Sequence, residues 1–136
     1  MANYVTVGAL DPEKSNAFYD AALAVIGWSK FMEFRGWRAY SEDGTSNGFT
    51  LWVCTPFNGE SASAGNGSMV GFMVKSREQV DAFYNAAMAN GGSDEGAPGE
   101  RPNYGSNWYA AYMRDPSGNK IGVVFNGRCL KIRLVT

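Results

Sequence analysis

The chain repeats itself at a fixed distance. Residues 17–24 read AFYDAALA, and the stretch that begins 65 positions later, at residue 82, reads AFYNAAMA. The same offset places Val5 on Val70 and Val7 on Phe72. Two copies are too few for a solenoid, which needs about three or more repeats to bury a continuous core. The duplication therefore predicts one domain, residues 1–136, with pseudo-two-fold symmetry.

Both copies show the same order of predicted elements. A short apolar strand comes first, and a helix with its own start signal follows it. Asp11 and Pro12 suit the first two positions of one helix, and Ser76 with Gln79 forms a capping box at the other. Three further strand candidates follow each helix. They are residues 28–34, 37–42 and 48–54 in the first copy, and 93–97, 107–114 and 120–125 in the second.

Each copy therefore has the order βαβββ, and the chain has the pattern of an α+β fold. The two modules, residues 3–56 and 68–125, are joined by a small, polar linker at 57–67. The turn Asp115-Pro-Ser-Gly118 joins the last two strands as a tight hairpin.

The composition argues against a nucleic-acid partner, against a membrane-spanning segment and against secretion. The formal net charge is −1 and no basic patch is present, so we expect no nucleic-acid partner. No apolar run is long enough to cross a bilayer, and the opening MANYVTVGALD lacks the charged start of a secretory signal. Cys54 and Cys129 stand in apolar strand-like contexts that favour free thiols. We therefore expect a cytoplasmic protein with no membrane partner.

The chain contains no histidine. Histidine is the commonest metal ligand and the usual general base near neutral pH. Its absence excludes Ser–His and Cys–His catalytic pairs and every site that needs an imidazole on zinc or iron. A metal held by carboxylates and carbonyls alone stays open at this point.

Four features together resemble a known superfamily. They are the opening VTVGALDPEKSNAFYDAAL, the duplication, the segment GGSDEGAPGERPNY and the stretch YAAYMRDPSGNKIGVV. In these features the chain resembles the vicinal oxygen chelate superfamily, which includes glyoxalase I, the bleomycin resistance proteins and extradiol dioxygenases. The resemblance implies two βαβββ modules that form a cupped, eight-stranded mixed sheet around a cavity. It also implies a homodimer.

The resemblance further implies where a metal would be held. In metal-dependent relatives the first and last strands of each module carry the ligands, typically His and Glu. Tyr4 and Met69 stand at the first-strand positions, and Gly122 stands at one last-strand position. The remaining position is Thr50 or Trp52, which strand parity does not decide. None of these side chains is a good ligand for a divalent cation, so we expect no metal and no cofactor.

The same positions predict an aromatic cavity with room at Gly122, and the loop at 98–109 adds further large side chains. The predicted ligand-binding residues are Tyr4, Trp52, Met69, Arg101, Tyr104, Trp108 and Gly122. Such a cavity suits an aromatic or cationic small organic molecule. Bleomycin resistance proteins bind their drug unaltered in an aromatic-lined cleft at a dimer interface, so the resemblance implies metal-free sequestration of a ligand.

Several alternatives stay open. The aromatic residues of the loop form a lid over the cavity or anchor the loop to the sheet or to a partner. Arg101 pairs an anionic group of the ligand, or it pairs Glu100 or Asp94 in solvent. The whole cavity could instead be closed core in a structural dimer without a ligand. A lyase or isomerase with an atypical site, using Glu33 or a tyrosine as acid or base, is the remaining enzyme alternative.

Overall fold

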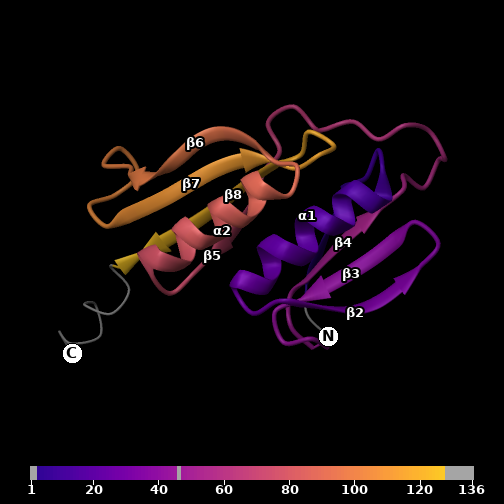
Figure 1. Cartoon of the computed structure of the whole chain (residues 1–136), viewed down its shortest axis with the longest axis horizontal. Coiled ribbons are helices and arrows are strands. Elements are labelled where there is room, and N and C mark those ends of the chain that lie inside the picture. The colour runs from indigo at the N-terminus through magenta and orange to yellow at the C-terminus, as the bar shows by residue number, and fades with distance from the viewer. Residues whose placement is uncertain (1–2, 46, 128–136) are drawn as a thin grey trace.

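The computed structural model describes residues 3–45 and 47–127. The first module contains β1 (Tyr4–Gly8), α1 (Pro12–Val25), β2 (Ser29–Phe34), β3 (Trp37–Ser41) and β4 (Thr50–Cys54). The second contains β5 (Val70–Met73), α2 (Arg77–Ala89), β6 (Ser93–Glu100), β7 (Trp108–Arg114) and β8 (Lys120–Asn126). The predicted α+β class and the repeated βαβββ order are confirmed. The strands form two four-stranded mixed sheets, ordered β1-β4-β3-β2 and β5-β8-β7-β6 (Figure 1).

Both helices begin where the sequence predicts. The Asp11 carboxylate accepts hydrogen bonds from the backbone N–H groups of Glu13 and Lys14 at 3.1 and 3.4 Å. Ser76 Oγ accepts one from Gln79 N at 3.2 Å. These bonds satisfy N–H groups that have no partner inside a helix, which is why each helix starts at these positions.

The two helices lie side by side and cover one face of both sheets (Figure 1). Phe18 and Leu23 of α1, Phe83 of α2, Leu51 of β4 and Ile121 of β8 are buried in this core. Because side chains alternate along a strand, the intervening residues lie on the opposite face of each sheet. We call this second face, which the helices do not cover, the open face.

Strand β6 extends to Glu100, three residues beyond the predicted end at residue 97. The pairing of β6 with β7 shifts register twice, between Asp94 and Gly96 and between Gly96 and Gly99. Pro98 lies within this irregular stretch of an edge strand, where a residue without an N–H group is tolerated. Residues 98–100 of the predicted loop therefore belong to a bulged edge strand, and residues 101–107 form the loop. No helix among the described residues is long and apolar enough to cross a membrane.

Candidate functional site

A hollow of about 490 Å³ lies on the open face of the second module. Trp108 and Tyr112 of β7 and Lys120 of β8 share this face because their positions alternate with buried core residues. The complete lining is Met69, Glu95, Gly96, Arg101, Tyr104, Trp108, Tyr112 and Lys120. The hollow therefore draws on all four strands of the module, or on residues next to them.

The surroundings of Gly122 differ from the open space that the sequence predicted there. Gly122 pairs directly with Tyr112 across the β7–β8 hairpin. A Cβ atom at Gly122 would lie 3.1 Å from Tyr112 Cε1 and 3.3 Å from Met69 Sδ. The Tyr112 ring thus fills the space that the sequence left vacant, because an aromatic ring laid over a strand glycine recovers packing that glycine lacks. Gly122 is buried and does not line the hollow.

The aromatic residues of the hollow form a connected wall. Trp108 Nε1 donates a hydrogen bond to the Tyr112 hydroxyl oxygen at 3.2 Å. The Tyr104 ring meets Trp108 edge to face, with ring centroids 6.1 Å apart and planes inclined by 72°. Tyr109, by contrast, faces the helices and donates to Asp81 of α2 at 2.7 Å, which raises its pKa. Trp108 and Tyr104 therefore border the hollow, whereas Tyr109 anchors β7 to α2.

Cations dominate the charge at this site. The guanidinium carbon of Arg101 lies 5.6 Å from the centroid of the Tyr112 ring, and Lys120 Nζ lies 5.8 Å from it. The one carboxylate in the lining, Glu95, lies 3.6 Å from Arg114 Nη2. The hollow therefore carries two positive charges around one aromatic ring.

The structure brings together four of the seven predicted binding residues: Met69, Arg101, Tyr104 and Trp108. Tyr4 and Trp52 lie on the first module instead. Tyr4 is 68% exposed on β1. Trp52 packs against Phe31 and Trp37, with ring centroids 6.3 and 6.0 Å away. Within a single chain, these two residues do not line the hollow of the second module.

Sequence reasoning missed Tyr112, Lys120 and Glu95. A signal for the first two was present in the hairpin. Once the turn is assigned to residues 115–119, Arg114 must oppose Lys120, and Tyr112 must then oppose Gly122. The pairing of Tyr112 with Gly122 places an aromatic ring over the glycine, and this could have been predicted from the hairpin register alone. Glu95 gave no comparable signal, because the bulges in β6 break the alternation of its side chains.

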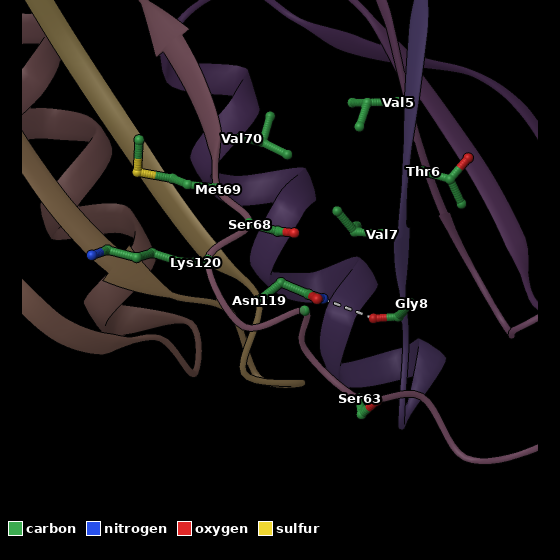
Figure 2. A pocket seen from close by; sticks show the side chains of 12 residues that line it. Val5, Thr6, Val7, Gly8, Ser63, Ser68, Met69, Val70, Asn119 and Lys120 are labelled. Carbon is green, nitrogen blue, oxygen red and sulfur yellow. Dashed lines mark hydrogen bonds between the residues drawn. The ribbon is translucent and has the colours of Figure 1, made fainter.

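A second hollow, of about 520 Å³, lies between β1 and β5 (Figure 2). Its lining combines those strands with small residues of the linker, including Ser63 and Ser68. Asn119 Nδ2 donates to the Gly8 carbonyl at 2.8 Å beside it, so the end of one module is tied to the other (Figure 2). Met69 and Lys120 line both hollows, and their side chains extend away from β1. The two hollows thus share a wall.

The predicted metal positions do not fit a divalent cation. Thr50 lies beside Tyr4 in the register of β1 and β4, and its hydroxyl donates to the Gly48 carbonyl at 3.2 Å. Met69 offers a thioether, and Gly122 offers no side chain. In residues 3–45 and 47–127, no group of three or more Cys, Asp or Glu side chains could hold a metal ion. Hard divalent cations need several oxygen ligands, and these positions do not supply them.

Neither Glu33, the carboxylate considered as a base, nor the free thiol of Cys54 is activated. Glu33 is exposed, and hydrogen bonds from Lys30 and Arg38 lower the pKa of its carboxyl group, so it is not a buried base. Cys54 is 2% exposed, and burial raises the pKa of its thiol. A raised pKa leaves the thiol protonated and therefore a poor nucleophile. Cys129 lies outside the described residues.

The chain is similar in sequence and in fold to known proteins. The family model described as the Glyoxalase/Bleomycin resistance protein/Dioxygenase superfamily matches residues 2–123. A glyoxalase/bleomycin resistance protein from Albidiferax ferrireducens T118 is 41% identical, with a TM-score of 0.79. That alignment covers 92% of this chain and 98% of the other. No curated protein matches the chain.

More distant solved structures share the fold. A glyoxalase-related enzyme from Fulvimarina pelagi is 22% identical with a TM-score of 0.72, covering 93% of this chain and 88% of the other. A lactoylglutathione lyase from Agrobacterium tumefaciens is 19% identical with a TM-score of 0.63, covering 92% of each chain. At these identities the likeness concerns the arrangement of helices and strands alone.

Proposed function

The chain belongs to the glyoxalase/bleomycin resistance protein/dioxygenase superfamily, and on that basis we propose that it binds a small organic molecule with a flat ring. The binding site is the hollow beside Tyr112, and the ligand is held without a metal and released unaltered. The observation that carries this proposal is the connected wall of Tyr104, Trp108 and Tyr112 around an open hollow.

The size and lining of the hollow support this function. A volume of about 490 Å³ lies within the range of small-molecule sites, which runs from about 300 to 1,000 Å³. Stacking against aromatic side chains contributes on the order of 1 kcal/mol for each ring pair. The lining also contains the cations Arg101 and Lys120, which would repel a cationic ligand. Of the two ligand types that the sequence allowed, the hollow therefore favours an aromatic molecule without positive charge.

Metal-free binding is supported by the donor set. The four positions at which relatives carry metal ligands hold no carboxylate and no imidazole in this chain. Sequestration rather than turnover is supported by the state of Glu33 and Cys54, because neither is prepared to act as base or nucleophile. We also place the protein in the cytoplasm, where a free Cys54 thiol is stable.

A homodimer is the further part of this proposal. The open face of the first module exposes large apolar side chains, among them Tyr4 at 68% and Phe34 at 57%. The Phe34 ring lies nearly parallel to the Trp37 ring, with an angle of 6° between the planes and 6.3 Å between the ring centroids, so the exposed rings of this face are held together. A second copy that covers this face in two-fold symmetry buries the same surface on both chains.

A thermal-shift screen with neutral and charged aromatic compounds tests ligand binding. A ligand at one hundred times its dissociation constant stabilises the folded state by about 2.7 kcal/mol. Tyr104→Ala removes one wall of the hollow and should reduce the shift, whereas Phe57→Ala, at an exposed aromatic residue outside the lining, should not. No shift from any compound, with an intact fold, would refute the proposal.

Elemental analysis of the purified protein tests the metal-free state separately. We expect far less than one equivalent of any divalent metal after dialysis, even when expression cultures contain nickel, zinc and manganese. A stoichiometric metal that survives dialysis would contradict the proposal, and its loss in a Tyr4→Phe or Met69→Leu variant would show that the family positions bind it.

A further inference from the structure

We infer that the ligand of this hollow is an aromatic carboxylate whose acid group lies between Arg101 and Lys120. The inference rests on the proposed binding function and names the chemical class of its ligand. Its first support is convergence. Arg101 follows the end of β6 and Lys120 begins β8, yet both approach the same Tyr112 ring, at 5.6 and 5.8 Å.

The second support is that neither cation is neutralised. Within the described part of the chain, no carboxylate lies within salt-bridge distance of Arg101 or Lys120. The sequence left Glu100 and Asp94 as possible partners of Arg101. Glu100 instead lies 3.3 Å from Arg77, and Asp94 accepts hydrogen bonds from Tyr84 and Gly96 N at 2.9 Å each.

The third support is the way Arg101 is held. Its Nη2 donates to the Ala97 carbonyl at 2.8 Å, and its Nη1 lies 3.5 Å from the Glu100 carbonyl. Two glycines of β6 leave space for the guanidinium group. A Cβ atom at Gly96 would lie 3.1 Å from Nη2, and one at Gly99 would lie 3.2 Å from Nη1. Strand β6 thus provides a bare surface on which the guanidinium rests.

Arginine keeps unused donors in this position. A guanidinium has five N–H groups, and the two carbonyl contacts leave others free for a ligand. Its planar fork matches the two oxygens of a carboxylate, whereas the Lys120 ammonium supplies a compact second charge. The excess of positive charge attracts an anion and repels an organic cation.

The ring and the acid group of one ligand can use the two parts of this site together. Trp108 and Tyr104 offer ring edges and faces for stacking, and the cations lie on the Tyr112 side of the same hollow. The volume of about 490 Å³ accommodates a bicyclic acid better than a free inorganic anion, which would leave the aromatic wall uncovered.

Isothermal titration with a matched set of compounds tests this assignment. The set is 2-naphthoate, 2-naphthamide and 2-naphthylmethylamine, which share one ring and differ in charge, together with inorganic phosphate, which is an anion without a ring. We expect the acid to bind about tenfold or more tightly than the amide, since hydrogen bonds to charged groups are the stronger ones. The amine and phosphate should bind more weakly than the amide. Raising the salt concentration should weaken binding of the acid and leave binding of the neutral amide unchanged.

Matched variants locate the effect. Arg101→Gln and Lys120→Gln should each lower the affinity for 2-naphthoate toward that for 2-naphthamide, and each should lower the affinity for the amide by a smaller factor. Lys75→Gln removes an exposed lysine outside the lining and should change neither. Circular dichroism of each variant checks that the fold is retained.

The outcomes separate the two proposals. Equal affinities for acid and amide, or tighter binding of the amine or phosphate, would overturn the carboxylate assignment and leave ring binding in place. Acid binding that persists unchanged in both Gln variants would also overturn it. Failure of all three naphthyl compounds to bind the folded protein would refute the binding function itself, and the carboxylate assignment with it.

Discussion

The Tyr19 hydroxyl donates a hydrogen bond of 2.6 Å to Asp115 Oδ2 and thereby joins helix α1 to the β7–β8 turn of the other module. The Asp115 carboxylate also accepts from Ser117 N and Asn119 N at 2.8 and 2.9 Å, and from Asn119 Nδ2 at 2.9 Å. Ser117 Oγ in turn accepts from Leu10 N at 2.9 Å. The turn between β7 and β8 therefore also connects the two modules through hydrogen bonds.

Removing the Tyr19 hydroxyl should destabilise the protein. Tyr19→Phe keeps the ring but deletes a donor to a carboxylate that is 3% exposed. Hydrogen bonds to charged groups contribute about 1.5–3 kcal/mol, so we expect a loss of that size in the free energy of unfolding. Urea denaturation followed by circular dichroism measures it.

Tyr84→Phe is the matched control for that experiment. Its hydroxyl donates to Asp94 at 2.9 Å, but Asp94 is exposed to solvent. Water replaces such a bond, so the loss should be clearly smaller than at Tyr19. Equal losses for the two variants would show that the Tyr19–Asp115 contact has no special role between the modules.

Stability should also fall in alkaline solution because of Tyr19. Burial, reinforced by the neighbouring Asp115, raises the pKa of this phenol well above its ordinary value of 10.0. The contribution is present below pH 10 and is lost as the pH rises above it, because the unfolded chain can then release a proton that the folded chain retains. Tyr19→Phe should flatten the decline in melting temperature above pH 10. A decline of unchanged slope would assign the effect to other groups, such as Tyr40, whose pKa is also raised by burial.

The fold was predictable from local signals that agree in both copies. The duplication gave the module order, and the caps at Asp11 and Ser76 gave the helix starts. The separation of the strands into two sheets was not predictable, because alternation within a strand does not reveal which strands pair at the module boundary.

The site was predictable only in part. Loop residues Arg101 and Tyr104 and the strand residue Trp108 lie together because they are near in sequence, and Met69 lies near them because β5 pairs with β8. The prediction that Trp52 lines the same site came from the metal-ligand positions of the superfamily, and not from the residues around Trp52 in the sequence. Its first-module position leaves it packed on Trp37 and Phe31.

Adjacent glycines on β5 and β8 provide a comparison of packing. Gly71 pairs with Gly122, but a Cβ at Gly71 would meet no atom within 4 Å. Gly71→Ala should therefore be neutral or stabilise by up to about 0.5–1 kcal/mol, since alanine restricts the unfolded chain. Gly122→Ala must displace the Tyr112 ring or the Met69 sulfur, so we expect it to be about 1–3 kcal/mol less stable than Gly71→Ala. Equal stabilities in urea denaturation would mean that the Tyr112 ring moves freely.

Introducing charge on the open face of the first module should disrupt the proposed dimer. Phe34 is 57% exposed in a single copy, so Phe34→Glu leaves the fold intact while placing a carboxylate in the interface. Burying one phenylalanine contributes about 1.5–3 kcal/mol, and two-fold symmetry doubles the effect, so dimer dissociation should rise by about a hundredfold or more. Sedimentation equilibrium measures this constant. Phe34→Leu keeps an apolar side chain and should remain dimeric. A wild-type protein that is monomeric at every concentration would refute the dimer, and a Phe34→Glu variant that dimerises normally would move the interface to another face.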